Sequence, residues 1–379
     1  MRTLPGNVLA LLKSRSMLGA DAPTGRIEFP EIVSATLGTV NSVGSGDVNF
    51  NWFYAFCQDN SRVYVISCNN EALAKGGGLY EWDGTNFRQL LANDISRRVT
   101  DISCAVYNGT LYAILRTGLS AGENKLYSFN GTAWVEVADN GAIPLIKLTT
   151  ANGALWAIAN VYNISTQPGG CLYRSTGGAW TKVTATHGQQ SLAPLFYNPE
   201  DKCLWSVGNT NPADNLAGRA TIVKYDTNGG SGWEVVVPGT AMPYDDCLIA
   251  QAGSRTQLIY WSGAMHIIDG DTGDVYRLDQ GQGRIIKLNK TIGAGIPCRE
   301  VTVKNEVLYL IPWQNSGWPA LYYFNGIRWV DFQLSNNQVV GDYRISFWAI
   351  LNWSKDNKLY AIGDAVAGKV PRLRAEAPN

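Results

Sequence analysis

The most informative stretch of the sequence for its fold is Leu126-Tyr127-Ser128-Phe129-Asn130-Gly131-Thr132-Ala133-Trp134-Val135-Glu136-Val137. It reads as an apolar strand, an Asn-Gly turn and a second strand that opens with Trp. Asn-Gly and Asp-Gly pairs favour the primed turns, whose twist matches that of a β-hairpin. Related phrases occur around residues 79–87, 172–183, 223–235 and 322–332. The sequence therefore predicts a recurring hairpin, with its Asn-Gly or Asp-Gly pair in a primed turn.

A second phrase precedes the hairpins. It is a short apolar strand with an aromatic residue at its centre, and these residues are Tyr64, Tyr112, Trp156, Trp205, Tyr260, Tyr309 and Tyr360. The successive gaps are 48, 44, 49, 55, 49 and 51 residues, which gives seven copies. A turn and a further strand usually stand before this phrase, so each unit holds four strands in meander order. Four-stranded units repeated every 40 to 50 residues or so are typical of a β-propeller.

We therefore expect an all-β fold, a β-propeller of seven four-stranded blades over residues 31–379. The blades are expected at residues 49–92, 99–138, 145–186, 191–238, 245–279, 297–334 and 343–374. The last span has room for about three strands, so a spare strand at 32–38 is expected to complete it and to tie the chain ends together. The fifth unit is degenerate, because its turn reads Asp269-Gly270-Asp271-Thr272-Gly273-Asp274 and no Trp follows. A ring of six blades is therefore an open alternative.

Composition excludes several classes of protein. The chain of 379 residues has 31 basic and 31 acidic residues, so its net charge is zero and 16% of it is charged. A nucleic-acid-binding protein usually shows a basic excess, so we expect no nucleic-acid partner. No apolar run approaches 18 residues and the start of the chain has no secretory signal pattern, so we expect no membrane insertion.

Metal ions, cofactors and disulfides are not expected. The seven cysteines form no CxxC pair, and an odd, scattered set is typical of reduced thiols packed as small apolar residues. The two histidines, His187 and His266, stand far apart, which argues against a zinc site. Asp269, Asp271 and Asp274 put three carboxylates within six residues, which calcium favours. A tight turn explains the same residues without metal, and the distal Glu of a calcium-binding hand is missing.

Residues 1–30 lie outside the repeat and are predicted to form an N-terminal anchoring segment. A short amphipathic helix is expected from about Asn7 to Leu18, followed by an extended linker. An apolar helix face needs a cover, either the propeller base or another protein. The candidate partner-docking residues are Leu4, Val8, Leu11, Leu12 and Leu18.

Two groups of aromatic residues have different expected roles. Trp313 and Trp318 interrupt the repeat in a polar loop at 312–319, so we predict that they contact a ligand or a host surface. The Trp residues that open the last strand of a blade keep a fixed register within the repeat, which indicates packing between blades. These are Trp134, Trp180, Trp233 and Trp329.

The sequence does not predict catalysis. A glycosidase needs paired carboxylates or a tyrosine nucleophile, and sequence spacing brings no two of the available acids together. Those acids include Asp101, Asp245, Asp246 and Glu300. No phosphate-binding glycine loop or HExxH motif occurs. We therefore expect a protein that is not an enzyme.

The opening of the chain resembles a group of viral proteins. Met1-Arg2-Thr3-Leu4-Pro5, then Leu11-Leu12-Lys13-Ser14-Arg15 and Pro23-Thr24-Gly25-Arg26-Ile27-Glu28, looks like the start of minor tail and other virion structural proteins of tailed bacteriophages. The Leu-Tyr-x-Phe-Asn-Gly-x-x-Trp phrase is similar to repeats of phage propeller proteins and of Kelch-like or tectonin-like lectins. The first resemblance covers about 30 residues, and the second covers the remaining chain.

The resemblance implies a virion structural protein of the tail, tail tip or fibre, made in the host cytoplasm. Such a protein would dock on other virion proteins through residues 1–30. It would also contact a host-surface glycan or receptor through propeller loops. A carbohydrate-binding lectin that acts alone is the alternative, followed by a glycosidase or lyase.

Overall fold

The computed structural model describes somewhat under three fifths of the chain, and every regular element in that part is a β-strand. The described residues are 31–36, 52–69, 78–92, 103–116, 124–137, 145–159, 171–183, 192–209, 220–238, 256–270, 272–289, 296, 298–312, 321–331, 339–340, 343–344, 346–364 and 372–376. A search of these residues for a helix able to cross a membrane finds none. The predicted all-β class is confirmed.

The described strands pair into seven four-stranded sheets and one two-stranded ribbon. We number the sheets as blades 1–7 along the chain, one for each predicted unit. Blades 1 and 2 contain β2 (Trp52–Gln58), β3 (Val63–Asn69), β4 (Gly78–Trp82), β5 (Phe87–Ala92), β6 (Ser103–Tyr107), β7 (Thr110–Arg116), β8 (Asn124–Phe129) and β9 (Trp134–Glu136). Blades 3 and 4 contain β10 (Leu145–Ala151), β11 (Ala154–Ala159), β12 (Cys171–Ser175), β13 (Thr181–Lys182), β14 (Leu192–Asn198), β15 (Cys203–Asn209), β16 (Ala220–Asp226) and β17 (Glu234–Val237).

The remaining strands complete the set. Blades 5 and 6 contain β18 (Gln257–Trp261), β19 (Ala264–Ile268), β20 (Val275–Asp279), β21 (Arg284–Lys287), β22 (Cys298–Lys304), β23 (Val307–Pro312), β24 (Tyr322–Phe324) and β25 (Trp329–Asp331). Blade 7 contains β28 (Ser346–Trp353), β29 (Lys358–Asp364), β30 (Arg372–Ala375) and β1 (Glu31–Thr36), and the ribbon contains β26 (Val339–Val340) and β27 (Tyr343–Arg344).

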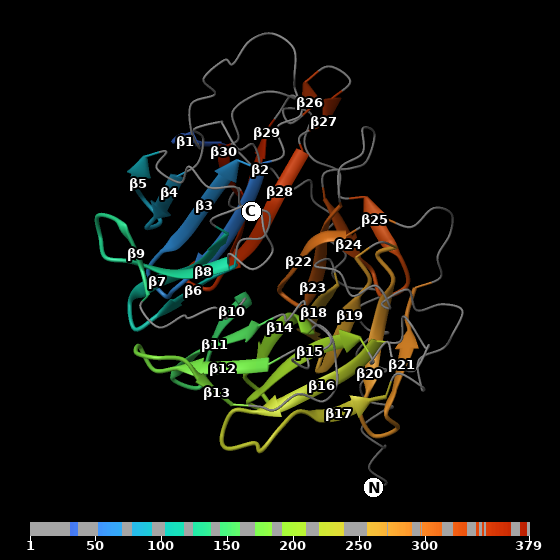
Figure 1. Cartoon of the computed structure of the whole chain (residues 1–379). Helices are drawn as coiled ribbons and strands as arrows, with labels where there is room; N and C mark the ends of the chain where they lie inside the picture. The colour runs from blue at the N-terminus through green and yellow to red at the C-terminus, as the bar shows by residue number, and fades with distance from the viewer. Residues whose placement is uncertain are drawn as a thin grey trace, which may run out of the picture.

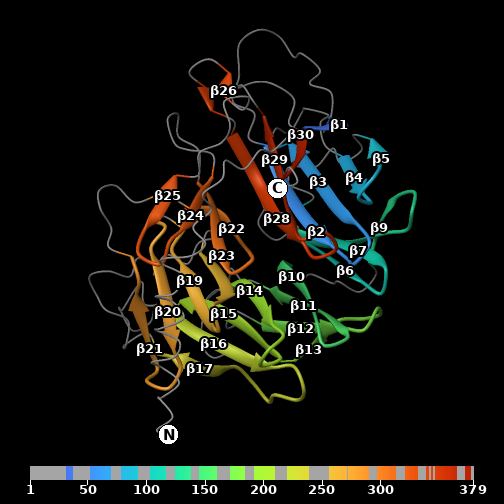
Figure 2. The ribbon, with the colours of Figure 1, turned by 180° about the vertical axis from the view of Figure 1, so that it is seen from behind.

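The blades form a closed ring. The first strand of each blade lies innermost and contacts the first strand of the next, from β2 through β6, β10, β14, β18, β22 and β28 back to β2. Figure 1 shows the sheets following one another around the ring from blue to red. The view from behind shows the red strands of blade 7 beside the blue strands of blade 1 (Figure 2). The fold is therefore a β-propeller, as predicted.

The start of the chain closes the ring. β1 pairs antiparallel with β30, with Glu31 opposite Arg374 and Thr36 opposite Arg372. β1 is thus the outermost strand of blade 7, whose other three strands come from the end of the chain. The predicted completion of the last blade by an N-terminal strand is confirmed.

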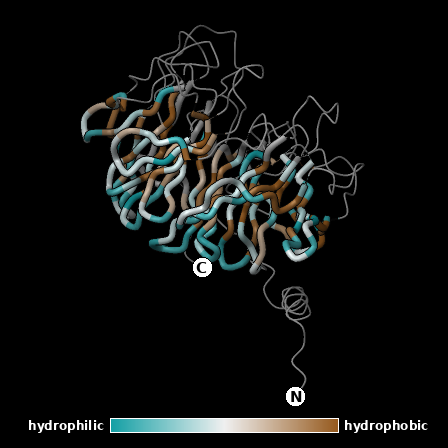
Figure 3. The backbone as a smooth tube through the Cα atoms, turned by 60° about the horizontal axis from the view of Figure 1, so that its bottom comes forward, coloured by the Kyte–Doolittle hydropathy of each residue, from teal (hydrophilic) through white to brown (hydrophobic). Residues whose placement is uncertain are grey.

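The two faces of the ring differ in their connections. Because successive strands are antiparallel, the first-to-second and third-to-fourth turns of the blades all lie on one face, which we call the short-turn face. These turns are hydrophilic and gather along one edge of the ring, while the strands behind them are more apolar (Figure 3). β1 is the fourth strand of its blade, and fourth strands start at the short-turn face and run away from it. Glu31, the first residue of β1, therefore lies at that face.

The primed turns are found one hairpin earlier than predicted. Both central residues have positive φ in the first-to-second turns at Asn108-Gly109 (49° and 75°), Asn152-Gly153 (45° and 69°) and Ser262-Gly263 (51° and 77°). This pair of angles is the signature of a type I′ turn.

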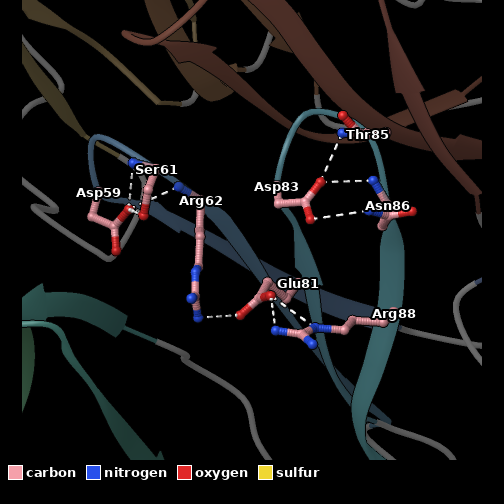
Figure 4. A network of polar contacts seen from close by, with 8 residues as sticks. All are labelled: Asp59, Ser61, Arg62, Glu81, Asp83, Thr85, Asn86 and Arg88. Atoms are coloured by element: carbon pink, nitrogen blue, oxygen red, sulfur yellow. Dashed lines mark hydrogen bonds and ion pairs between the residues drawn. The ribbon is translucent and has the colours of Figure 1, made fainter.

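In the predicted hairpins only the glycine is positive, as at Gly84 with φ 99°. There the Asp83 Oδ1 accepts hydrogen bonds from the N–H groups of Thr85 (2.8 Å) and Asn86 (2.7 Å), which holds a different turn (Figure 4). The prediction of primed turns at these pairs was wrong, because the side chain of the Asp or Asn closes the turn itself.

The boundaries of the fifth blade also differ from the prediction. Blade 5 runs from Gln257 to Lys287, not from 245 to 279. Tyr260 lies on the first strand, and His266 on β19 takes the central position that an aromatic residue holds in the other blades. Since Leu258–Tyr260 and Met265–Ile267 are both apolar and short, the local pattern did not reveal which one is the second strand.

His266 is a core residue in its neutral form. It is 2% exposed, and its ring lies 4.9 Å from the ring of Trp261. Its Nδ1 lies 3.0 Å from the carbonyl oxygen of Ala264, so the neutral ring carries its proton on Nδ1. Burial lowers the pKa of His266 to about 4, against the opposing effect of that backbone contact.

Replacing His266 with Phe is expected to reduce acid sensitivity. The folded pKa lies below the ordinary value of 6.5, so the unfolded state binds the proton first as pH falls. The contribution of His266 to the free energy of unfolding is therefore complete above pH 6.5. It falls by about 3 kcal/mol as the pH drops through 4. Urea unfolding at pH 7.5 should show H266F about 1 kcal/mol less stable, through the lost hydrogen bond. At pH 4 the order should reverse, and parallel pH profiles for the two proteins would contradict the prediction.

Candidate functional site

The residues predicted for docking and contact lie outside the described part of the chain. These are Leu4, Val8, Leu11, Leu12, Leu18, Trp313 and Trp318. The structure shows where their segments attach. Residues 1–30 join β1 at the short-turn face, and residues 313–320 join the ends of β23 and β24 at the opposite face. The predicted loop at 312–319 stays a prediction, because residues 313–320 lie outside the described residues.

The repeated Trp residues pack in the cores between blades, as predicted. Trp233 is 3% exposed, and its ring lies 6.0 Å from that of Tyr225. Trp134 packs against Phe129 at 5.7 Å. Trp329 donates its indole N–H to the carbonyl of Gly273 in the preceding blade at 2.6 Å. Trp180 packs against the cluster shared by blades 2 and 3.

The aspartates considered for calcium serve the turn between β19 and β20. Asp269 Oδ1 accepts a hydrogen bond from the N–H of Thr272 at 3.1 Å. Asp274 forms an ion pair with Lys287 at 2.9 Å. Asp271 lies outside the described residues. Among the residues that the structure describes, no group of three His, Cys, Asp or Glu side chains could hold a metal ion.

The cysteines whose side chains are described are free thiols, as predicted. They are Cys57, Cys104, Cys171, Cys203 and Cys298. All are buried except Cys104, which is half-buried. Burial raises the pKa of Cys298 well above its ordinary value, which keeps it protonated and unreactive.

A groove of about 570 Å³ opens on the short-turn face between blades 3 and 4. Three elements supply its walls: the turn at Asn152, the end of β12 at Arg174 and the hairpin at Asn228. The Asn152 Nδ2 donates to the Asn228 Oδ1 at 3.0 Å, which links the two blades across one end of the groove.

The base of the groove is a fixed aromatic pair. Trp156 and Tyr225 are 2% and 4% exposed, with ring centroids 5.6 Å apart. The Trp156 indole N–H donates to the carbonyl of Ala151 at 2.9 Å, and the Tyr225 hydroxyl donates to the carbonyl of Gly230 at 2.8 Å. Both polar atoms are therefore satisfied, and the rings are held in place.

Arg174 lies exposed above this pair. Its guanidinium carbon is 5.6 Å from the centroid of the Trp156 ring, a cation–π distance. Burial raises the pKa of Tyr225, and the charge of Arg174 opposes that rise. The groove thus carries one positive charge, held over an aromatic ring.

The repeat offers internal comparisons for this charge. In blade 1 the position equivalent to Arg174 is Glu81, which is 2% exposed and is bound by Arg62 at 2.8 Å and by Arg88 at 2.6 Å (Figure 4). In blade 4 it is Lys224, which pairs with Glu234 on the facing strand at 3.4 Å. Opposite Arg174 stands Thr181, which has no charge.

Sequence reasoning missed this groove. The hairpin at 172–183 was interpreted as one more copy of the repeat. The available signal was its departure from that repeat, since Ser175-Thr176-Gly177-Gly178 replaces the Phe-Asn-Gly of other copies and Thr181 faces Arg174. Recognising that the residues meet Asn152 and Asn228 needs the arrangement of two blades.

Inner-strand side chains also bind the backbone of the next blade. The Ser103 Oγ on β6 accepts a hydrogen bond from the N–H of Leu148 on β10 at 2.9 Å. The Glu300 Oε2 on β22 likewise accepts from the N–H of Ile350 on β28 at 2.9 Å. Glu300 is the only one of the four acids named above, the others being Asp101, Asp245 and Asp246, that falls within the described residues.

Glu300 is held in an environment that disfavours its charge. Burial raises the pKa of Glu300 to about 7, although the Ile350 N–H and the positive charges of Arg299 and Lys147 oppose the rise. Lys147 belongs to the inner strand of blade 3, so its charge acts from another part of the ring. The carboxyl is therefore partly protonated at neutral pH while it joins blades 6 and 7.

Replacing Glu300 with Gln is expected to improve stability at alkaline pH. The folded pKa of about 7 exceeds the ordinary 4.5, so the unfolded state loses its proton first as pH rises. The contribution of the protonated group is complete below pH 4.5 and is lost through pH 7, by about 2–3 kcal/mol. Urea unfolding should give E300Q and the parent similar stability at pH 5. E300Q should be the more stable at pH 8.5, and equal stability there would contradict the prediction.

Comparisons with known proteins show likeness in fold only. No family model matches the chain, and no curated protein matches it. Among solved structures, YCF48 bound to D1 peptide is similar at 13% identity and a TM-score of 0.53, over 94% of this chain and 99% of that one. YCF48 from Cyanidioschyzon merolae is similar at 9% identity and a TM-score of 0.53, over 93% and 98% of the two chains.

An enzyme is among the other similar structures. Puromycin hydrolase is similar at 12% identity and a TM-score of 0.52, over 82% of this chain and 50% of that one. At such identities the likeness extends to the fold and not to the function. The chain therefore shares its propeller fold with proteins of unrelated function.

Proposed function

We propose that the protein is a non-enzymatic virion structural protein of a tailed bacteriophage, made in the host cytoplasm and associated with the tail, tail tip or fibre. Its propeller docks on other virion proteins through residues 1–30. The supporting observation is the ring closure by β1, the outermost strand of blade 7. Residues 1–30 join the ring at its periphery, where the described sheets are complete without them.

The same attachment suggests an orientation on the particle. Glu31 begins β1 on the short-turn face, so a segment anchored to the particle brings that face towards it. The strand ends that flank residues 313–320 lie at the opposite face. Trp313 and Trp318 are then the candidates for contact with a host-surface glycan or receptor.

Two lines of support concern the kind of function. YCF48, which is similar in fold, was solved with a bound peptide, so a ring of this type can bind a polypeptide. The sequence contains no HExxH motif, and its one Gly-x-Ser-x-Gly stretch, at 118–122, stands between β7 and β8 of one blade and not between a strand and a helix, which favours docking over catalysis. Puromycin hydrolase shares the fold, but this chain spans only half of that chain.

The docking role is tested with full-length variants and tailed particles purified from the source lysate. V8D/L11D/L12D puts three charges on the predicted apolar face of the anchor. N7D/S14D/S16D adds the same charges at polar positions of the same segment and is the matched control. All three proteins should melt at the same temperature, because the changes lie outside the blades.

Co-sedimentation with the particles gives the readout. The parent and the control should sediment with the particles, whereas the apolar-face variant should stay at the top of the gradient. Failure of the parent to sediment with particles, or equal sedimentation of the apolar-face variant, would overturn the proposal.

A further inference from the structure

We propose that the groove between blades 3 and 4 binds a carboxylate-bearing sugar, with Arg174 as the residue that pairs with the carboxylate. This site goes beyond the docking role and does not depend on it, because none of its residues belongs to the segment 1–30. The argument has three steps: the charge, the polar lining and the size.

Among the described residues, the charge of Arg174 has no acidic counterpart. None of the ion pairs among the described residues includes it, and the groove lining contains no Asp or Glu. The nearby Asp226 accepts hydrogen bonds from the N–H and side-chain amide of Asn228, at 2.8 and 3.2 Å. A planar guanidinium held over an aromatic ring is suited to bidentate binding of a carboxylate.

Other blades show that an unbalanced charge at this position is not a general feature of the repeat. Glu81 and Lys224 are balanced by residues on the facing strand, Arg88 and Glu234. Arg277 in blade 5 faces Ile286, but it is half-buried and lines no part of the groove. Arg174 combines exposure, an uncharged facing residue and a cavity.

The rest of the lining suits hydroxyl groups more than a peptide. Asn152 presents its amide oxygen, and Thr176 and Thr181 present hydroxyls, while the amide of Asn228 is held by Asn152 and Asp226. Trp156 and Tyr225 are almost fully buried, so they offer little apolar surface to a ligand. Peptide-binding sites usually rely on pockets for large apolar anchors, whereas amides and hydroxyls match the hydrogen-bonding groups of a sugar.

The size of the groove fits one to a few sugar units. Its volume of about 570 Å³ falls within the range of small-molecule sites, about 300–1,000 Å³. A ligand of this size would place its carboxylate at Arg174 and its hydroxyls towards Asn152, Thr176 and Thr181.

The test uses matched acidic and neutral sugars on the purified full-length protein. The probes are 3′-sialyllactose against lactose, and trigalacturonate against its methyl ester, with triglutamate as an acidic peptide. Binding is measured by saturation-transfer NMR and titration calorimetry at low salt. The acidic sugars should bind at least about tenfold more tightly than their neutral partners, because charge-assisted hydrogen bonds contribute to them alone.

Variants connect that binding to the groove. R174Q should weaken acidic-sugar binding at least about tenfold and leave the weak binding of neutral sugars unchanged. R174K keeps the charge without the planar fork and should fall between the two. K182Q removes an exposed charge from the neighbouring strand position outside the lining and should bind as the parent does.

Three outcomes would overturn the proposal. They are no binding of either acidic sugar at 10 mM or so, equal binding by R174Q and the parent, and tighter binding of triglutamate than of both acidic sugars. Each of them leaves the co-sedimentation result untouched, since that experiment reads residues 1–30. Failure of the docking role would likewise leave the sugar titration intact.

Discussion

Replacing Gly273 with Ala is expected to lower the free energy of unfolding by about 3–4 kcal/mol. Gly273 has φ +69°, a conformation that costs an L-residue roughly 1–2 kcal/mol. A Cβ at this position would also collide with the carbonyl oxygen of Ile296 at the start of blade 6. Relief of that collision must move the turn between β19 and β20, which packs against blade 6.

Two hydrogen bonds between blades 5 and 6 depend on this turn. The Gly273 carbonyl accepts from the Trp329 indole at 2.6 Å, and the Gly270 carbonyl accepts from the N–H of Cys298 at 2.8 Å. Each such bond contributes about 0.5–1.5 kcal/mol, so their loss adds to the backbone strain.

Gly263→Ala is the matched control for this prediction. Gly263 belongs to the same blade and has φ +77°, but a Cβ there would meet nothing within 4 Å. It should cost about 1 kcal/mol, the strain alone. Urea unfolding of both variants measures the difference, and equal losses would show that the contact with Ile296 does not matter.

Replacing Glu376 with Ala is expected to cost about 3–5 kcal/mol, as is typical when one partner of a buried ion pair is removed. Glu376 is 4% exposed and forms an ion pair with Lys304, whose side chain is 11% exposed. The Glu376 Oε2 also accepts a hydrogen bond from the N–H of Leu359 at 3.0 Å. The substitution leaves a buried ammonium group and a backbone N–H without their acceptor.

Two further variants separate the buried charge from the lost side chain. K304M/E376L replaces both charges with apolar groups of similar size and should recover most of the loss. E136A breaks the exposed pair of Lys125 and Glu136, whose side chains are 43% and 47% exposed, and should cost less than about 1 kcal/mol. Urea unfolding measures the loss of stability in each variant. If E376A loses as little stability as E136A, the pair of Lys304 and Glu376 does not behave as a buried ion pair.

Local signals in the sequence were sufficient for the strands of most blades. Tyr112 and Trp156 mark second strands because apolar alternation with a central aromatic residue is a local pattern, and the turn residues bound it. In blade 5 the same pattern occurs twice in succession, around Tyr260 and His266. Only pairing with β20 shows that His266 is on the second strand.

The candidate site was largely beyond prediction. The predicted contact residues, such as Leu11 and Trp313, remain predictions because they lie outside the described residues. Arg174 looked like an ordinary strand residue, since nothing within one copy of the repeat shows whether a charge has a partner. That property depends on Thr181 opposite and on Asn228 in the next blade.

Local patterns were enough to predict the all-β class, the repeated four-stranded unit and the closing strand, which was expected at 32–38 and is found at 31–36, because apolar periodicity and turn residues act over a few neighbouring positions. The tertiary structure decided which charges are balanced and which are buried. The groove at Arg174, the pair of Lys304 and Glu376 and the raised pKa of Glu300 all arise between blades. Their energies come from desolvation and contacts among residues far apart in the chain, which no local pattern encodes.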